Sequence, residues 1–372
     1  MADHDVPDAG SGGLSLGADD IVDTPMQHTT AASHEETPLL TRSGAVRIGL
    51  WGGVHSGKTL FAGALQIAVN ALGARGDGAG LRSMPMNVDA SRHMMEAFGA
   101  LGKKSDLPAS TVNARDLRWT FSGKLQDPET IRPRLHALSW VHRPVQFELD
   151  LRDPPGIDYD NDSEGEEVNE SIRKLISADG IIYLFDPIAA DRDERFETLF
   201  LHTLGRLNAN SIVGGRVDRY LPQRLAVCVT KFDDQKVFDK AVSAGLVFSD
   251  SAGQLRVPTG KHSQQFFELL CEDSDDSNAL HLLQAIRNNF RPKSVRYYIT
   301  SALGFSGEHG GGGGLPWPKL RRCPNVMDTA AGHQGVREQA RPVNVIEPLL
   351  YLVRQTRRDR ARVARRYQSY SE

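Results

Sequence analysis

Apolar positions recur along this chain in two patterns that together predict a sheet covered by helices. Short, almost continuous apolar runs are typical of strands buried on both faces of a parallel sheet, whereas apolar residues three or four positions apart predict helices. Strands are predicted over about residues 45–51, 116–124, 145–151, 181–186, 224–229 and 294–299, and helices over about residues 58–71, 89–98, 168–176, 192–207, 264–289 and 343–357. Because strands alternate with helices, we expect a three-layer α/β fold with a mostly parallel six-stranded sheet.

The remaining segments divide the chain into one large domain and two tails. Residues 1–43 are rich in Asp, Gly, Ser and Thr without apolar periodicity, which predicts a disordered acidic arm. Residues 44–357 form the expected domain, and residues 358–372 form an arginine-rich C-terminal tail. Within the domain, residues 75–87 are expected to be a loop and Asp89 the N-cap of the following helix. The domain carries three expected insertions, at about residues 75–105, 234–262 and 304–340.

Composition and charge narrow the function classes. The chain has 372 residues, 40% of them hydrophobic, which suffices for a sizeable core, and its formal net charge of −3 argues against a general nucleic-acid-binding protein. The three cysteines, Cys228, Cys271 and Cys323, predict neither a disulfide framework nor a zinc site. With no signal peptide and no apolar stretch of about 18 residues, we expect a soluble cytoplasmic protein. We expect both tails to be solvated; contact of the arginine-rich tail with an anionic membrane and intramolecular attraction of the acidic arm stay alternatives.

A glycine-rich turn between the first strand and the first helix carries the most specific chemistry. Glycines let backbone N–H groups converge on a β-phosphate at a helix N-terminus, which has a partial positive charge. Lys58 then reaches the β- and γ-phosphates, and the Thr59 hydroxyl binds Mg²⁺. A turn that only joins two elements would leave this lysine and threonine unexplained. Residues 52–59 match the pattern G-x-x-x-x-G-K-S/T, and the residues expected at the nucleotide are Gly52, Gly53, Val54, His55, Ser56, Gly57, Lys58, Thr59 and Leu60.

A second motif follows the third predicted strand, where Asp153, Pro154, Pro155 and Gly156 form the pattern D-x-x-G. The pattern is common, and its position gives it meaning, because ligands of parallel sheets bind at the carboxyl ends of the strands. An aspartate here can hold Mg²⁺ through a water, and a glycine N–H three residues later can donate to the γ-phosphate. The next loop, residues 157–167, then senses that phosphate. The alternative is a plain strand-ending turn.

Two further motifs follow the last two predicted strands. Thr230, Lys231 and Asp233 form the pattern T-K-x-D. A carboxylate can accept from both N1–H and the 2-amino group of guanine, and adenine offers neither donor, so Asp233 predicts selection of GTP over ATP. The aliphatic stem of Lys231 would lie along the base. The motif S-A-L can offer a backbone N–H to guanine O6, and it comprises Ser301, Ala302 and Leu303.

In this order the motifs resemble those of the Ras-like, translation-factor (TRAFAC) class of P-loop GTPases. The resemblance covers about residues 45–357 and implies a three-layer P-loop NTPase G domain. Residues 107–111 and 342–350 further resemble bacterial double-GTPase proteins, in which two G proteins are partners. The segments that look like the phosphate loop, the D-x-x-G, the N/T-K-x-D and the S-A-K/L motifs of the class are residues 52–59, 153–156, 230–233 and 300–303.

The resemblance also implies residues that complete the site. A threonine ahead of the second strand is expected to close on Mg²⁺ and the γ-phosphate; Thr111 fits that place, and Thr120, inside the strand, is the rival. The chain departs from the class at Ile157, which stands where a glutamine usually orients the attacking water. Isoleucine cannot hydrogen-bond water, so hydrolysis either uses another group, with Asp158 and His55 as candidates, or is slow until a partner supplies one.

These motifs predict a Mg²⁺-dependent molecular switch that binds GTP or GDP and hydrolyses GTP slowly or with a partner's help. A guanine nucleotide and a protein effector, activator or second GTPase are the expected partners. Two alternatives stay open: a nucleotide-binding interaction module without turnover, which Ile157 favours, and an ATP-using P-loop NTPase. The residues expected to act in hydrolysis are Lys58, Thr111 and Gly156, and those expected to hold Mg²⁺ are Thr59, Thr111 and Asp153.

Overall fold

The computed structural model divides the chain into two units, Met1–Thr41 and Arg42–Glu372. All described residues belong to the second unit, so the expected acidic arm, residues 1–43, lies outside them. The structure describes residues 46–53, 56–74, 81–101, 115–126, 142–153, 166–190, 195–213, 218–249, 255–256, 260–272, 278–306, 323–328 and 334–368.

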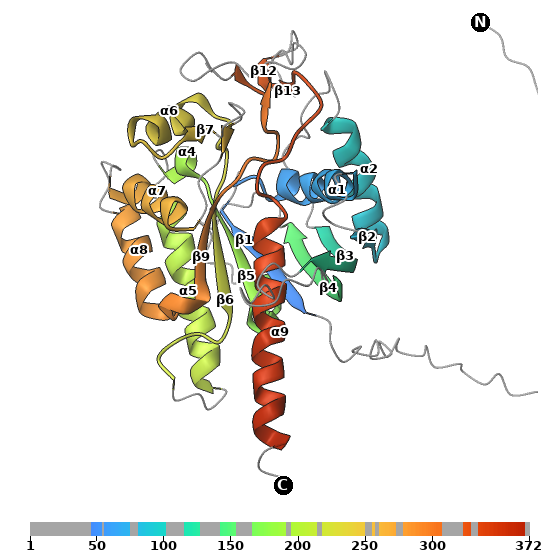
Figure 1. Ribbon diagram of the computed structural model, residues 1–372. Helices are drawn as coiled ribbons and strands as arrows, with labels where there is room; N and C mark the ends of the chain where they lie inside the picture. Colours follow the sequence, from blue (N-terminus) through green and yellow to red (C-terminus); the bar gives the residue numbers. More distant parts are fainter. Residues whose placement is uncertain are drawn as a thin grey trace, which may run out of the picture. The chain divides into compact units, whose positions relative to one another are not determined.

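The second unit is built on a sheet of seven strands in the order β2-β3-β4-β1-β5-β6-β9 among the described residues (Figure 1). The pairs β4–β1, β1–β5, β5–β6 and β6–β9 are parallel, whereas β2–β3 and β3–β4 are antiparallel. The expected α/β fold with a mostly parallel sheet is therefore confirmed. The strands are β1 (Arg47–Gly52), β2 (Arg82–Pro85), β3 (Arg115–Gln126), β4 (His142–Asp153), β5 (Gly180–Phe185), β6 (Arg224–Val229) and β9 (Val295–Ile299).

The expected count of six strands is wrong, because β2 adds a seventh strand beyond β3. It falls within residues 75–87, which the pattern predicted to be a loop. β2 has only four residues, and they alternate between exposed and half-buried positions, so it forms no apolar run that would mark a strand. Its pairing with β3 defines it: the register runs from Arg82 opposite Ser122 to Pro85 opposite Trp119.

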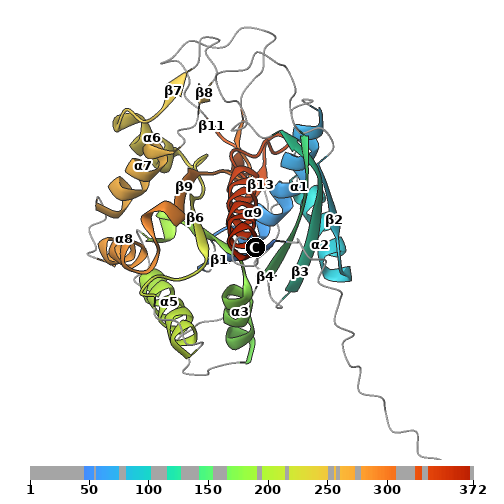
Figure 2. The same ribbon diagram turned by 60° about the horizontal axis from the view of Figure 1, so that its bottom comes forward.

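Helices cover both faces of the sheet, as β5 illustrates, since all six of its residues are buried. Ile182 and Leu184 share a core with α1, α2 and α9 on one face. Ile181, Tyr183 and Phe185 share a core with α3, α5, α6, α7 and α8 on the other (Figures 1 and 2). Such alternation is typical of a strand between two helical layers. The helices are α1 (Lys58–Ala74), α2 (Val88–Ala100), α3 (Glu166–Ser177), α4 (Pro187–Ala190), α5 (Arg195–Val213), α6 (Gln235–Ser243), α7 (Lys261–Glu272), α8 (Asn278–Asn289) and α9 (Glu347–Gln368).

The start of α2 differs from the expectation. The Asn87 side chain accepts a hydrogen bond from Ala90 N at 3.1 Å, and the Asn87 backbone is extended, with φ −143° and ψ 169°. Asn87, and not Asp89, is therefore the N-cap. Asp89 lies in the first turn, where a carboxylate faces the positive end of the helix dipole.

The end of α9 also differs from the expectation. The pattern predicted a helix end at Arg357 followed by a tail, whereas α9 continues to Gln368. Within that continuation, Arg224 at the start of β6 donates to Asp359 Oδ2 from Nε at 2.9 Å and from Nη2 at 2.5 Å. These residues therefore belong to a helix that is tied to the sheet.

In their described residues, the two later insertions contain α6 and three small antiparallel sheets. The small sheets pair β7 (Phe248–Ser249) with β8 (Leu255–Arg256), β10 (Phe305–Ser306) with β11 (Cys323–Pro324), and β12 (Val326–Asp328) with β13 (Gln334–Val336).

In the part of the chain that the structure describes, no helix is both long and apolar enough to span a membrane.

Candidate nucleotide-binding site

Four neighbouring strands end side by side, and residues of interest follow each of them (Figure 1). Gly52 at the end of β1 pairs with Leu184 of β5. Phe185, the last residue of β5, pairs with Val229 of β6, which in turn pairs with Ile299 of β9. The glycine-rich loop after β1, the T-K-x-D motif after β6 and the S-A-L motif after β9 therefore lie along one edge of the sheet, where ligands of parallel sheets bind.

Glycine is required at two positions of the loop after β1. Gly57 has a φ of +86°, in the left-handed region that residues with a Cβ rarely adopt. A Cβ on Gly52 would lie 2.5 Å from Ser56 Oγ and 3.0 Å from the Leu184 carbonyl oxygen. The chain can therefore follow this tight path from the strand into α1 only with glycine at both positions.

Lys58 is the first residue of α1, and its side chain turns back over the loop. Its Nζ donates to the carbonyl oxygens of Gly53 at 2.7 Å and Gly52 at 3.1 Å, and the residue is buried. Phe61 N donates to Gly57 O at 2.7 Å. The N–H groups of Lys58, Thr59 and Leu60 therefore come before the backbone hydrogen bonds that run along the helix. An ammonium group and the positive end of a helix dipole thus share one loop, which is the electrostatic setting for a phosphate.

Ser56, in the same loop, is a second and independent sign of a ligand. The residue is fully buried, and its N–H donates to Gly53 O at 3.3 Å. Its hydroxyl has no hydrogen-bond partner among the described residues. Buried hydroxyl groups without a partner are uncommon, because leaving one unpaired costs about 1–3 kcal/mol. A phosphate oxygen bound in the loop would supply the missing acceptor.

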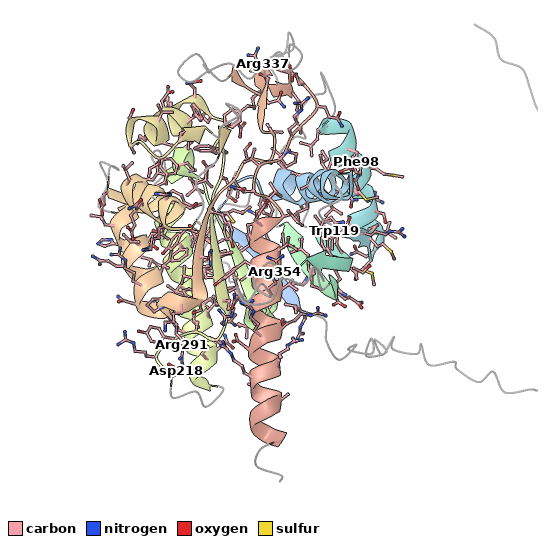
Figure 3. All side chains as sticks on the ribbon, viewed as in Figure 1. Phe98, Trp119, Asp218, Arg291, Arg337 and Arg354 are labelled. Atoms are coloured by element: carbon pink, nitrogen blue, oxygen red, sulfur yellow. The ribbon has the colours of Figure 1, made fainter. Side chains whose placement is uncertain are left out.

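A contact between α2 and α1 supports the start of α1, directly after the loop. The sequence pattern did not predict this contact. His93 of α2 is buried, and its Nε2 lies 3.2 Å from the backbone oxygen of Thr59. The His93 ring also meets the ring of Trp119 on β3 edge-on, with 5.9 Å between centroids; Trp119 is labelled in Figure 3. The sequence signal was weak, since His93 stands between Ala90 and Ala97 on the apolar side of a short predicted helix.

Asp153, expected to hold Mg²⁺ through a water, is the last residue of β4. β4 is parallel to β1, and their pairing ends with Asp150 opposite Gly49, three residues before Asp153 on β4 and three before Gly52 on β1. No group of three or more His, Cys, Asp or Glu residues able to hold a metal occurs among the described residues. Mg²⁺ usually takes one or two carboxylates from a protein and completes its shell with phosphate oxygens and water.

The T-K-x-D motif is held by hydrogen bonds to the strands on both sides of β6. Thr230 N and Oγ1 both donate to Phe185 O, at 2.8 and 3.0 Å, and Phe232 N donates to Thr300 O at 3.2 Å. Lys231 between them has a φ of +55°. This conformation costs a residue with a Cβ about 1–2 kcal/mol, and such strained residues cluster at ligand sites.

Asp233 is buried next to this turn and has a hydroxyl as its partner. Ser301 Oγ donates to Asp233 Oδ1 at 2.5 Å. Burial raises the pKa of the Asp233 carboxyl from 3.8 to about 6, although the hydrogen bond from Ser301 opposes the rise. A buried carboxyl with so strongly raised a pKa, at the edge where ligands bind, is a candidate for ligand recognition.

The S-A-L motif is braced by the segment that precedes α9. Ser301 and Val343 exchange two backbone hydrogen bonds, of 3.1 and 2.8 Å, and Arg341 N donates to Leu303 O at 3.0 Å. Ser301 Oγ also accepts from Gly304 N at 2.7 Å. Gly304 has a φ of +71°, and a Cβ there would lie 2.1 Å from Arg341 O, so this turn too needs glycine.

Asn325 ties the same motif to the β12–β13 hairpin. Its fully buried side chain donates to Leu303 O at 3.1 Å and to Glu338 O at 3.0 Å, and accepts from Glu338 N at 2.9 Å. Arg337 N donates to Asn325 O at 3.0 Å, and Figure 3 shows Arg337 at this hairpin. The predicted insertion, residues 304–340, thus positions a motif of the site.

Asp186, directly after β5, is a further residue to which the sequence assigned no role. It is fully buried, and its Oδ1 accepts from Ile188 N at 3.0 Å and Ala189 N at 3.3 Å at the start of α4. Its Oδ2 lies 2.6 Å from Lys231 Nζ. The available signal was a carboxylate at the end of an apolar strand, in a sheet whose neighbouring strands all end at a motif.

Thr120, the rival of Thr111, lies inside the sheet, opposite Met84 of β2 on one side and Glu148 of β4 on the other.

Several expected site residues are not among those described. The roles of all the expected site residues stay predictions, and those outside the described ranges are Val54, His55, Thr111, Gly156, Ile157 and Asp158. The residues placed at the common edge are Gly52, Gly53, Ser56, Gly57, Lys58, Thr59, Leu60, Thr230, Lys231, Asp233, Ser301, Ala302 and Leu303.

Comparison with known proteins does not establish a family. No family model and no curated protein matches the chain. Among solved structures, it is similar to the Arl6 (BBS3) small GTPase of Trypanosoma brucei with the bound nucleotide analogue GppNp, at 9% identity and a TM-score of 0.26, over 70% of this chain and 88% of that chain. It is also similar to a Thermus thermophilus protein, at 16% identity and a TM-score of 0.26, over 70% of this chain and 38% of that one. Both scores are too low to argue function.

Proposed function

We propose that the protein is a GTP-binding molecular switch that binds guanine nucleotides at the edge formed by β1, β5, β6 and β9. The observation that carries this proposal is the shared edge: the loop of Lys58 follows β1, and the buried carboxylate of Asp233 follows β6. Neighbouring strands lie about 4.8 Å apart, so the ends of β1 and β6 are separated by about 10 Å across β5. A single nucleotide can therefore span a phosphate end and a base end.

At the phosphate end, the first turn of α1 and the Lys58 ammonium would neutralise the β- and γ-phosphates. Gly52 and Gly57 allow the backbone to approach the phosphates closely. The buried Ser56 hydroxyl would donate to a phosphate oxygen. Because these groups are fixed by the fold, they would stabilise the charge that moves onto the leaving phosphate as a water attacks in line.

Mg²⁺ fits this end as a shared ligand of protein and phosphate. The Thr59 hydroxyl would bind it directly, Asp153 would hold it through a water, and Thr111 is the third expected ligand. When bound, Mg²⁺ neutralises charge on the phosphate oxygens. His93 contacts the Thr59 carbonyl oxygen and would hold the Thr59 backbone in place for this.

At the base end, Asp233 would accept from N1–H and the 2-amino group of guanine. Ser301 Oγ holds one oxygen of the carboxylate, which fixes its orientation, and Ala302 would offer its N–H to guanine O6. Adenine has no proton on N1 and no 2-amino group, so a buried carboxylate here selects guanine.

We further propose that hydrolysis to GDP and phosphate is slow, or fast only with a protein partner, because Ile157 stands where a water-orienting glutamine is expected. A single-turnover phosphate-release assay, with and without candidate partners, measures this. The second candidate function is an interaction module that binds GTP without turnover, and Ile157 is the observation that favours it. Release at the uncatalysed rate in every condition would select that module.

Isothermal titration calorimetry with GTP, GDP and ATP in the presence of Mg²⁺ tests the guanine site. We expect guanine nucleotides to bind at least about a hundredfold more tightly than ATP, because a site with a buried carboxylate rejects a base that lacks the matching donors. Comparable affinity for ATP would remove the guanine assignment and favour an ATP-using enzyme.

The substitution Asp233→Asn gives a more specific test of the same site. We expect GTP affinity to fall about ten- to a hundredfold, as for the loss of hydrogen bonds to a charged group, and xanthosine triphosphate to become the better ligand, because its 2-oxo group accepts from the amide. Asparagine still accepts from Ser301 Oγ and removes a buried charge, so the thermal unfolding transition should not fall. An unaltered base preference would leave Asp233 a structural residue.

A further inference from the structure

Two carboxylates lie near one ammonium group at the base end of the site. Asp233 follows Lys231 by two residues, and Asp186 comes from the end of the neighbouring strand β5. Asp186 holds the ammonium, since its Oδ2 lies 2.6 Å from Lys231 Nζ. The hydrogen bond to Asp233 Oδ1 comes instead from the Ser301 hydroxyl. The lysine is therefore paired with the carboxylate that does not face the expected base.

Asp186 is fixed for this task by its other oxygen. Oδ1 accepts from Ile188 N at 3.0 Å and Ala189 N at 3.3 Å, so the first turn of α4 holds the carboxylate in one orientation. The residue is fully buried, and the strand that precedes it, β5, is paired with β1 on one side and with β6 on the other. Oδ2 is thereby presented to the T-K-x-D turn without freedom to move away.

Lys231 is fixed from the opposite direction. Its backbone is in the left-handed region with φ +55°. Its two neighbours, Thr230 and Phe232, donate hydrogen bonds to Phe185 O at the end of β5 and to Thr300 O directly after β9. The backbone therefore fixes where the lysine side chain starts, and Asp186 fixes where its ammonium group ends. If the ammonium were not held by Asp186, Asp233, the buried carboxylate of the same turn, would attract it, since opposite charges interact strongly in a partly buried site.

We propose that Asp186 keeps the base-reading carboxylate available: by pairing with Lys231 Nζ it prevents the ammonium from pairing with Asp233, and it lays the lysine stem along one face of the base. This inference rests on the proposed guanine site and adds a positioning residue to it. Asp186 touches no part of the nucleotide in this arrangement and acts through Lys231.

The substitution Asp186→Asn tests the inference with little change in shape. Asparagine Oδ1 still accepts from Ile188 N and Ala189 N, and only the charge that holds Lys231 is removed. We expect GTP and GDP affinities to fall about tenfold or more, because Asp233 becomes engaged by the ammonium, and weak ATP binding to fall less, because adenine has no donors for Asp233. Asp239→Asn on α6 is the matched control, since it removes the same charge from an exposed residue that is hydrogen-bonded to Gln235, and it should bind GTP as the wild type does.

A second substitution separates positioning from mere structural support. In the Asp186→Asn background, Lys231→Met removes the ammonium and keeps an aliphatic stem for the base. We expect the double variant to bind GTP several-fold more tightly than Asp186→Asn alone, which is strong non-additivity between neighbours. If Asp186 only stabilised the fold, the double variant would bind no better than the single one, and the inference would be overturned.

Nuclear magnetic resonance titration of the Asp233 carboxyl gives a readout that needs no nucleotide. The charged and polar groups that act on Asp233 are Ser301, Asp234 and Lys231. In Asp186→Asn the approach of the ammonium should lower the pKa of Asp233 below its wild-type value of about 6. Wild-type protein that binds no guanine nucleotide would end the proposed function, and this titration would still decide whether Asp186 keeps the ammonium of Lys231 away from Asp233. Equal GTP affinity of wild type and Asp186→Asn would end the inference and leave the guanine site intact.

Discussion

Asp233 combines two properties that oppose each other. Burial raises the pKa of its carboxyl to about 6 because it disfavours the charged form, whereas reading the donors of guanine requires that charged form. Ser301 lowers the pKa again by donating to Oδ1. The carboxyl is therefore ionised at neutral pH and protonated in mildly acidic solution, so the base end of the site should respond to pH.

We expect guanine-nucleotide affinity to fall as pH decreases through about 6. If only the ionised carboxylate accepts from the base, about a tenth of the free protein is competent at pH 5, and the dissociation constant for GDP should rise about tenfold between pH 7 and pH 5. Calorimetric titrations at half-unit intervals measure it. The residual GDP binding of Asp233→Asn is the control and should lack this step; a wild-type profile that is flat between pH 5 and 7 would contradict the raised pKa.

At the scale of elements, the long buried strands could be predicted because each carries its own signal. β5 and β6 are continuous apolar runs, and both formed where the pattern placed them. β2 could not be predicted, since four residues with no apolar run become a strand only through pairing with β3. The same difference applies to the site. The phosphate loop is contiguous in sequence, whereas Asp186 and Asn325 gain their roles from partners that the fold brings close.

The packing of α2 on α1 shows how an element from a predicted insertion supports the phosphate loop. A Cβ on Gly63 of α1 would lie 2.4 Å from Ala97 Cβ on α2, so the helices touch through a glycine. Contact this close holds His93 of α2 at the Thr59 carbonyl oxygen, 3.2 Å away. The sequence of α1 alone could not predict this contact, because a glycine within a helix does not indicate which element packs against it.

Gly63→Ala should therefore loosen both the fold and the site. We expect the free energy of unfolding to fall by about 1–3 kcal/mol through overpacking, and GTP affinity to fall with it as α2 moves away from Thr59. Gly205→Ala on α5 is the matched control: no atom lies within 4 Å of a Cβ at Gly205, so we expect a gain of about 0.5–1 kcal/mol and unchanged affinity. Chemical denaturation and GTP titration measure both; equal stability of the two variants would contradict the close contact.

In the folded unit as a whole, the last helix, α9, is bound to the starts of the strands, at the opposite end of the sheet from the candidate site. Arg47 N at the start of β1 donates to Asp179 Oδ2 at 2.8 Å, and Arg360 Nη2 of α9 lies 2.9 Å from both oxygens of that carboxylate. Arg224, the first residue of β6, is bound by Asp359. α9 thus joins the starts of three neighbouring strands, whereas the nucleotide motifs follow their ends. Stability and binding should therefore respond separately to changes in α9.

A stop codon after Arg357 removes both of these ion pairs and retains the buried apolar half of α9. We expect the free energy of unfolding to fall by about 0.5–2 kcal/mol, since partly exposed pairs contribute modestly, and GTP affinity to stay unchanged because the site lies at the other edge. The difference should shrink in about 1 M salt, where the Debye length falls to roughly 3 Å and partly exposed ion pairs are weakened. Arg362→Ala is the control, because Arg362 is 74% exposed and contacts Asp359 at 3.7 Å within the helix. Denaturation of the wild type, the truncated chain and Arg362→Ala at low and high salt measures this. A truncated chain as stable as the full one would show that the second half of α9 does not contribute to stability.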